Sequence, residues 1–307
     1  MADVRGIDGV RVRASGKINL ALRVGPRRAD GYHPLATVFQ SVSVYDDLEV
    51  RPAPPGEFPV TVTGAQADLV PTDGRNLVVK AGRLLAEAYG SPDAGAAIAI
   101  RKSIPVTGGM AGGSADCAAA LVALSVLWDL DVTQSELLDL GKQLGADVPF
   151  SLMGQTAYGI GRGDDLVPVL SRGSYHWVLA FADFELSTPA VFARFDELSP
   201  DPSPALGVPT GMLEALASGD ATALAGVLVN DLQPAALSLR PELSKTMAEG
   251  MDAGALASMV SGSGPTIAFL ASSEEAAIDL SFRLSAADVC RTVRRVSGPV
   301  QGAKLVA

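Results

Sequence analysis

A run of glycines between a predicted strand and a predicted helix constrains this chain more than any other feature. Four of the six positions from Gly108 to Gly113 are glycine. Glycine lets a backbone approach a ligand closely and adopt positive φ, and a helix N-terminus presents unpaired N–H groups with partial positive charge. A tight turn alone would need only one glycine. The segment therefore predicts an anion site, above all for phosphate, ahead of a helix over 115–127 with Ser114 at its N-cap.

The glycine segment matches none of three common site motifs. It has the glycine spacing of a Walker A loop, but Ser114 stands where that motif requires lysine. The chain has no G-x-G-x-x-G dinucleotide fingerprint at this segment and no G-x-S-x-G nucleophile elbow. A phosphate site outside the two commonest phosphate-binding folds is therefore expected.

Composition excludes several classes of protein. The 307 residues include 24 Lys+Arg and 34 Asp+Glu, a formal net charge of −10, and aromatic residues make up only 5%. Nucleic-acid binding needs a basic surface or a stacking platform, so no nucleic-acid partner is expected. Two cysteines and two histidines cannot build a disulfide framework or a Cys/His metal cage, so no metal-ligating residue is predicted.

The distribution of apolar residues indicates where the protein works. Residues 1–12 are interrupted by charges and lack the apolar core of a signal peptide. No apolar run approaches the roughly 20 residues of a membrane span. We therefore expect no membrane partner and a cytoplasmic protein.

Strand and helix patterns are interspersed along the chain. Residues 133–136 form a capping box that opens a helix to residue 144, and the prolines of 200–209 predict a long exposed connection. The mixture indicates an α+β fold that divides near residue 163 into two domains, 1–163 and 164–307. Strands are predicted at 10–24, 35–50, 58–63, 96–100, 156–160, 177–182, 267–270 and 291–296, and further helices at 76–89, 212–217, 221–228, 241–251 and 274–284.

Four other segments carry chemistry that is ambiguous when each is taken singly. Lys17 and Asn19 share one face of an apolar strand, which could be a solvated face. The Asp-Gly turn before Tyr32 and His33 could present a base-binding pair or close a hairpin. Asp147, before a proline, could be a partly buried carboxylate or a local turn contact. The second glycine turn, at 261–264, could be a hairpin or a second wall of a ligand cleft.

The order of these segments resembles the GHMP kinase superfamily. Its three motifs correspond to the Lys17 strand, P-x-x-G-G-x-A-G-G-S-A at 105–115 and S-G-S-G-P-T at 261–266. S-G-K-I-N at 15–19, A-D-G-Y-H at 29–33, G-A-D-V-P at 145–149 and S-T-P at 187–189 resemble one branch of it, over about 11–296. That branch phosphorylates the 2-hydroxyl of a cytidine diphosphate-linked alcohol in the non-mevalonate isoprenoid pathway. The resemblance implies a two-lobed fold with the active site between the lobes, ATP binding and catalysis in 1–163 and substrate binding in 164–307.

The resemblance also implies roles for the motif residues. Lys17 and Asp147 match the catalytic pair, in which the carboxylate accepts the proton of the substrate hydroxyl and the lysine screens charge as the phosphoryl group moves. ATP is the implied phosphoryl donor, with Mg²⁺ bound mainly through its phosphates. The implied ATP-binding residues are Pro105, Val106, Thr107, Gly108, Gly109, Met110, Ala111, Gly112, Gly113, Ser114 and Ala115.

The implied partner is a small cytidine diphosphate-linked molecule. Tyr32 and Phe192 match the residues that stack on cytosine, and His33 and Lys102 match those that hydrogen-bond it. Asn19 and Thr188 match polar contacts to the same substrate.

Some features depart from the pattern or leave other interpretations open. Ala111 and Ala115 stand where many relatives have other small residues, and the resemblance assigns no role to Arg162 or to the proline-rich 200–209 segment. The alternatives are another small-alcohol kinase of the superfamily, of the homoserine or mevalonate type, a non-catalytic nucleotide or sugar-phosphate sensor, and a dehydrogenase. The absent dinucleotide fingerprint argues against the dehydrogenase, and the presence of both Lys17 and Asp147 argues against the sensor.

Overall fold

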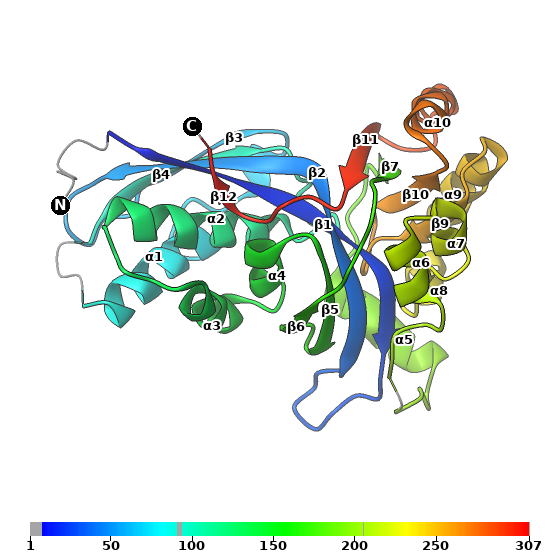
Figure 1. Ribbon diagram of the computed structural model, residues 1–307, viewed down its shortest axis with the longest axis horizontal. Helices are drawn as coiled ribbons and strands as arrows, with labels where there is room; N and C mark the ends of the chain where they lie inside the picture. The colour runs from blue at the N-terminus through cyan, green and yellow to red at the C-terminus, as the bar shows by residue number, and fades with distance from the viewer. Residues whose placement is uncertain (1–7, 91–93, 205, 307) are drawn as a thin grey trace.

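Two sheets with helices packed against them form the protein (Figure 1). The computed structural model describes residues 8–90, 94–204 and 206–306. The mixed strand and helix content confirms the predicted α+β class. Among these residues, no helix is both long and apolar enough to cross a membrane.

The larger sheet has eight strands and is built around two long antiparallel ones, β1 (Val10–Val24) and β2 (Leu35–Pro52). The first part of β2 pairs with β5 and its last part with β4, so β2 spans the length of the lobe. The other strands of this sheet are β3 (Val60–Gly64), β4 (Ala96–Lys102), β5 (Thr156–Gly161), β6 (Asp165–Pro168), β8 (Val229–Asn230) and β12 (Lys304–Leu305).

Helices α1 (Leu77–Ala88), α2 (Gly112–Leu127), α3 (Gln134–Leu144) and α4 (Val148–Met153) cover one face of the larger sheet (Figure 1). Helix α2 lies at the centre and contacts β1, β2, α1 and α4. It is rich in alanine and most of its residues are buried, as expected of a helix that is surrounded by other elements. The capping box at Thr133 and Glu136 is present at the start of α3, as predicted.

The smaller sheet has the order β11-β7-β10-β9, and helices pack against it (Figure 1). Trp177 of β7 is fully buried, and its Nε1 donates a hydrogen bond to Gln40 Oε1 of β2 at 3.1 Å, which joins the two sheets. The strands are β7 (Tyr175–Phe181), β9 (Ala257–Val260), β10 (Ile267–Ala271) and β11 (Thr292–Gly298); the helices of this half are α5 (Thr188–Leu198), α6 (Met212–Ser218), α7 (Ala221–Ala225), α8 (Gln233–Leu239), α9 (Glu242–Asp252) and α10 (Glu274–Ala286).

The domain division at residue 163 stays a prediction. Strand pairing shows where the chain passes from the larger sheet to the smaller one. Strand β6 pairs with β5, so the change from one sheet to the other falls after Pro168 and before Tyr175. The second half also returns to the larger sheet, because β8 and β12 both pair with β1. The two lobes are therefore interlocked along β1.

Two sequence-based expectations about helices were wrong. Helix α2 begins at Gly112, not at Ala115, and its N-cap is Ala111, not Ser114. Ala111 has a φ of 57°, so the chain turns into the helix earlier than the glycines suggested. Helices α4, α5 and α8 were not predicted, and all three have a proline in their first turn.

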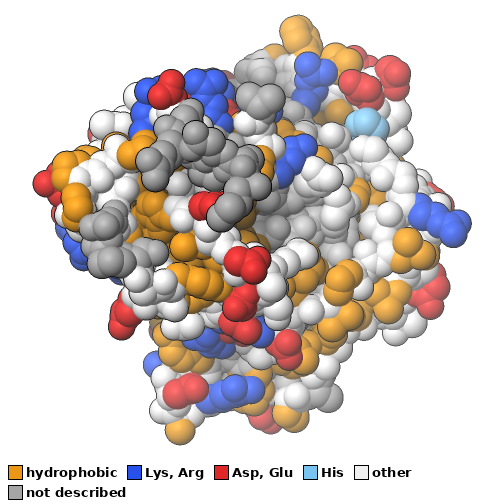
Figure 2. Space-filling model, turned by 60° about the vertical axis from the view of Figure 1, so that its left-hand side comes forward, with side chains coloured by type: hydrophobic (Ala, Val, Ile, Leu, Met, Phe, Trp, Pro, Cys, Tyr) orange, Lys and Arg blue, Asp and Glu red, His pale blue; other side chains and the backbone are white. Residues whose placement is uncertain are grey.

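Charged side chains are spread over the surface. Figure 2 shows acidic and basic groups interspersed on one face, among hydrophobic side chains. Several of them are paired, including Arg11 with Glu49 and Arg13 with Asp47.

Candidate active site

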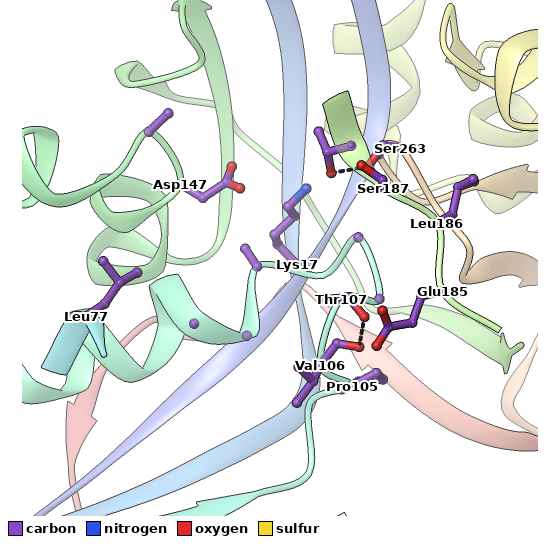
Figure 3. A pocket seen from close by; sticks show the side chains of 18 of the residues that line it. Lys17, Leu77, Pro105, Val106, Thr107, Asp147, Glu185, Leu186, Ser187 and Ser263 are labelled. Carbon is purple, nitrogen blue, oxygen red and sulfur yellow. Dashed lines mark hydrogen bonds between the residues drawn. The ribbon is translucent and has the colours of Figure 1, made fainter. Parts of the chain in front are cut away.

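A cleft of about 890 Å³ lies where the two lobes meet. Its walls come from β1, the glycine loop, the segment before α4, and the 185–189 segment that leads into α5. Figure 3 shows Lys17 and Asp147, from different elements, pointing into the same space. The second glycine turn contributes Gly262 and Ser263 to the cleft and also joins the antiparallel strands β9 and β10, so both interpretations of this turn apply.

The glycine loop supplies one long wall of the cleft. The residues that line it are Pro105, Val106, Thr107, Gly108, Gly109, Ala111, Gly112 and Gly113. Met110 and Ala115, predicted to be in the ATP site, are completely buried in the core, and Ser114 is not among the lining residues. The main-chain oxygen of Met110 accepts a hydrogen bond from the Lys17 N–H at 3.2 Å, which ties the loop to β1.

Gly109 makes the closest approach between the glycine loop and the second glycine turn. Its φ is 72°, and a Cβ there would lie 2.2 Å from the main-chain oxygen of Ser261. The Ser261 hydroxyl donates to the Gly109 oxygen at 3.2 Å. Only glycine fits this position, so the two turns support each other.

Lys17 and Asn19 face the cleft from an irregular part of β1. Register shifts against β2 lie on either side of them, at Ser15/Gly16 and Asn19/Ala21. Such shifts re-aim side chains and are common beside active sites. Lys17 Nζ donates to Asn19 Oδ1 at 2.8 Å, and Asn19 Nδ2 donates to Thr37 Oγ1 at 2.8 Å. The prediction that Lys17 and Asn19 share one face is confirmed.

Lys17 is only 6% exposed, and its environment alters its acidity. Burial lowers the pKa of Lys17, because a charged amine loses its hydration there, while the negative charge of Asp147 opposes that change. The two side chains are therefore close enough to interact electrostatically. Within 8–90, 94–204 and 206–306, no ion pair within 4.0 Å joins them.

Asp147 stands at the N-cap position of α4 but does not cap that helix. No hydrogen bond from its carboxylate to the helix is present in the described structure, whereas its main-chain oxygen accepts from the Ser151 N–H at 3.0 Å and from the Ser151 hydroxyl at 3.1 Å. The residue is partly buried, in agreement with the first of its two interpretations. The backbone is thus held while the carboxylate is left to face the cleft (Figure 3).

An aromatic group lies at the end of the β1–β2 hairpin. The His33 ring stacks on Phe192 with centroids 5.1 Å apart, and its Nε2 donates to Asp196 Oδ1 at 2.7 Å. Phe192 and Thr188 line the cleft, and Thr188 Oγ1 shares a hydrogen bond with Ser263 Oγ at 2.7 Å. Tyr32 is 61% exposed and is not among the lining residues. Of the predicted substrate residues, Asn19, Thr188 and Phe192 therefore line the cleft and His33 lies beside it.

Lys102, predicted to hydrogen-bond the cytosine together with His33, instead forms ion pairs with two aspartates. Its Nζ donates to Asp46 and, at 2.7 Å, to Asp116 Oδ2. It lines the cleft beneath the glycine loop, where a Cβ on Gly112 would come within 3.3 Å of its Nζ. The ammonium group of Lys102 is thus held by two buried carboxylates, whereas His33 contacts Phe192 and Asp196.

Sequence reasoning missed a further part of the cleft wall. It comes from the 3-10 helix η1 (Ala67–Leu69), the chain after it and the start of α1, with Leu69, Val70, Pro71 and Leu77 giving an apolar surface beside the glycine loop. Asn76, which caps α1, also lines it, and a helix-cap pattern is the only signal that could have drawn attention to it. Arg162, left without a role, lines the cleft and pairs with Asp164 at 2.7 Å.

Family models match both halves of the chain. The model of the GHMP kinases N terminal domain matches 76–155, and that of the GHMP kinases C terminal domain matches 212–289. A 4-diphosphocytidyl-2-C-methyl-D-erythritol kinase of Mycolicibacterium gilvum is 55% identical over 97% of this chain and 92% of its own length. That of Rhodococcus jostii is 54% identical over 97% and 95%. The chain belongs to the 4-diphosphocytidyl-2-C-methyl-D-erythritol kinase family.

Solved structures agree with membership of this kinase family. A crystal structure of 4-(cytidine 5'-diphospho)-2C-methyl-D-erythritol kinase superposes with a TM-score of 0.75 at 33% identity, over 94% of this chain and 98% of the other. A homoserine kinase from Cytophaga hutchinsonii has the same TM-score at 19% identity, over 97% and 98%, which shows the shared fold alone. The predicted two-lobed GHMP kinase fold is confirmed.

Proposed function

We propose that this chain transfers the γ-phosphoryl group of ATP to the 2-hydroxyl of 4-diphosphocytidyl-2-C-methyl-D-erythritol. The observation that carries the proposal is the position of Lys17 and Asp147 in one cleft, between the glycine loop and the Phe192 wall. A nucleotide on the loop and a cytidine-bearing alcohol on the aromatic side would present the phosphoryl group and the hydroxyl to this pair. Membership of the kinase family supports this choice of substrates.

The proposed reaction depends on positioning and on charge. The Asp147 carboxylate accepts the proton of the 2-hydroxyl as its oxygen attacks the γ-phosphorus, and ADP departs with the electrons of the broken P–O bond. Lys17, held against Asn19, neutralises the negative charge that moves between the two oxygens. Asn19 and Thr188 orient the substrate.

The glycine loop is suited to the nucleotide phosphates. Gly108, Gly109, Gly112 and Gly113 leave its surface free of side chains, and α2 begins beside them with unpaired N–H groups. The described residues contain no cluster of three or more His, Cys, Asp or Glu side chains able to hold a metal ion. We expect Mg²⁺ to be held mainly through the phosphates, whose charge it would neutralise.

On the other side of the cleft, the Phe192 ring and the exposed Tyr32 ring are proposed to hold the cytosine, with His33 as its hydrogen-bonding partner. A base held between two rings is recognised by stacking, while hydrogen bonds distinguish it from other bases. Lys102, which is already bonded to two carboxylates, is assigned to the nucleotide side instead. The predicted cytoplasmic location stays a prediction.

The test is a phosphoryl-transfer assay with purified protein and a panel of alcohols. We expect ATP-dependent phosphorylation of 4-diphosphocytidyl-2-C-methyl-D-erythritol, and kcat/KM at least about 10³ lower for homoserine and mevalonate, because sites built to hydrogen-bond a substrate reject analogues that lack its groups. CMP should compete with the alcohol and not with ATP. Faster phosphorylation of homoserine or mevalonate would assign the chain to another GHMP activity, and nucleotide binding without transfer to any alcohol would make it a sensor.

A further inference from the structure

Three charged side chains are buried together beneath the glycine loop. They are Lys102 at the end of β4, Asp46 of β2 and Asp116 of α2, and their side chains are 2%, 1% and 4% exposed. Lys102 and Asp116 also line the cleft. The proposed catalytic steps use none of the three.

The hydrogen bonds of the two carboxylates are unequal. Asp46 accepts from the main-chain N–H groups of Ser103 at 2.6 Å and Ile104 at 2.9 Å, in addition to Lys102. Among the described donors, Asp116 accepts from Lys102, through Oδ2 at 2.7 Å, and its carboxyl group lies close enough to that of Asp46 for the two to interact. Asp116 Oδ1 is buried and has no hydrogen-bond partner in the described part of the chain.

One lysine cannot neutralise two carboxylates that are this deeply buried. Two acids that share such a site tend to hold one proton between them, and hydrogen bonds to the ionised form decide which acid loses it. Asp46, with three donors, is the better anion. The proton therefore belongs on Asp116, and its place is Oδ1, since Oδ2 already accepts from Lys102.

The acidity of Asp116 agrees with this assignment. The pKa of Asp116 is raised to about 8, chiefly by burial; the positive charge of Lys102 opposes this rise and the negative charge of Asp46 adds to it. Among its neighbours, Cys117 stays neutral because burial raises the pKa of that thiol to about 12. On α1, which packs against α2, the charged side chains of Lys80, Arg83 and Glu87 are exposed. Lys17 on β1 and Asp147 before α4 face the same cleft.

An ionised carboxylate at this position would repel the phosphates that the loop is proposed to bind. A neutral acid is instead a hydrogen-bond donor, and an unpartnered donor at an anion site needs an acceptor. We propose that Asp116 is held as a neutral carboxylic acid whose Oδ1 hydroxyl donates a hydrogen bond to a phosphate oxygen of the bound nucleotide. The inference rests on the proposed function for the identity of that ligand.

The test compares wild type with Asp116→Asn and Asp116→Ala in calorimetric titrations with ADP, from pH 7 to 9.5, with and without Mg²⁺. In wild type, the dissociation constant should rise about tenfold or more across this range, as Asp116 ionises. Asp116→Asn keeps a neutral donor, so it should match wild type at pH 7 and lose most of the rise. Asp116→Ala should bind several-fold more weakly already at pH 7. Any rise that remains in Asp116→Asn reports the deprotonation of Lys17.

Infrared difference spectra supply a second measurement that needs no nucleotide. At pH 7 the carbonyl stretch of a protonated carboxyl should be present in wild type and missing in Asp116→Asn. Asp46→Asn is the matched control for stability, since it alters the carboxylate that receives three hydrogen bonds. It should lower the melting temperature, whereas Asp116→Asn should leave it within a few degrees of wild type.

Three results would overturn the inference. A wild-type affinity for ADP that does not change with pH would exclude an ionising donor at the phosphates. Weakening of Asp116→Asn at pH 7 only when Mg²⁺ is present would make Asp116 a carboxylate ligand of the cation. An unchanged carbonyl stretch would place the proton elsewhere. A wild-type protein that does not bind ADP at any pH would overturn the proposed function together with this inference.

Discussion

Lys17 and Asp147 face one cleft without forming an ion pair. Lys17 Nζ is bonded to Asn19 Oδ1 at 2.8 Å, and the Asp147 carboxylate makes no hydrogen bond to the helix that it precedes. Their charges nevertheless interact, because Asp147 opposes the effect of burial on the pKa of Lys17. A separated pair leaves room for a substrate hydroxyl beside the carboxylate and a phosphoryl group beside the lysine, which a closed ion pair would not.

Replacing Asp147 by asparagine should remove catalysis and leave the fold intact. We expect kcat to fall by about 10²–10⁴, the usual contribution of a positioned general base, with little change in either KM. The melting temperature should hold, since the hydrogen bonds from Ser151 go to the main-chain oxygen. Asp165→Asn, at an exposed aspartate on β6, is the control and should keep full activity. Steady-state kinetics that show most of the turnover retained in Asp147→Asn would make this residue a binding group.

Lys17→Met should separate activity from stability. The pKa of Lys17 is lower in the folded protein than in the unfolded chain. At pH values between these two pKa values, the unfolded chain therefore binds more protons than the folded protein. The free energy of unfolding rises with pH in this range. Lys17→Met should abolish this rise and leave the melting temperature at pH 7 equal or higher, because no buried charge remains. Its kcat should fall by orders of magnitude.

Thermal unfolding between pH 7 and pH 10 measures this effect, and Lys80→Met, at an exposed lysine, is the control. A fall of many degrees in Lys17→Met at pH 7 would show that the ammonium group is needed for the fold itself.

Tyr32→Ala should affect only one of the two substrates. Loss of a stacking partner for cytosine is worth about 1–3 kcal/mol, so the KM for the cytidine-linked alcohol should rise about 5- to 150-fold while the KM for ATP stays the same. Stability should not change, because the side chain is 61% exposed. Leu170→Ala removes a similarly exposed side chain and should change neither KM. Equal increases in both KM values would refute the assignment of Tyr32 to the cytosine.

Gly109→Ala tests the contact between the two glycine turns. The added Cβ would overlap the Ser261 oxygen, so Ser261 and the loop must move apart. Gly56→Ala has the matching φ of 73° with nothing within 4 Å, so it reports backbone strain alone, about 1–2 kcal/mol. Urea unfolding should show a larger loss for Gly109→Ala, by about 1–3 kcal/mol, and calorimetry should show weaker ADP binding. Equal losses in the two variants would mean that the turns separate freely.

The glycine loop and the helix that follows it show which features of the site could be predicted from the sequence. The residue types at 105–113 were sufficient to predict a phosphate loop before a helix, because glycine and a helix N-terminus have local physical properties. The start of that helix was misplaced by three residues, because the residues just before it, Gly109 and Met110, are held by contacts with the second glycine turn and β1. Local propensity does not contain those contacts.

Lys102 and Asp116 show what sequence could not reveal. Lys102 could be matched to a motif position, but its partners Asp46 and Asp116 lie 56 and 14 positions away, and only the fold brings them together. Asp116 lies within a helix that reads as a buried alanine-rich segment, so no local pattern marked it. Lys17 and Asp147 were paired only through resemblance, and their arrangement in one cleft became visible only in the structure.

A structure of the protein with a non-hydrolysable ATP analogue and 4-diphosphocytidyl-2-C-methyl-D-erythritol would test the proposed arrangement most directly. We expect the 2-hydroxyl to lie within hydrogen-bonding reach of the Asp147 carboxylate, about 2.6–3.2 Å, and in line with the γ-phosphorus near Lys17. The triphosphate should lie along the glycine loop and the cytosine against Phe192. A complex with the triphosphate away from that loop, or with the 2-hydroxyl out of reach of Asp147, would contradict it.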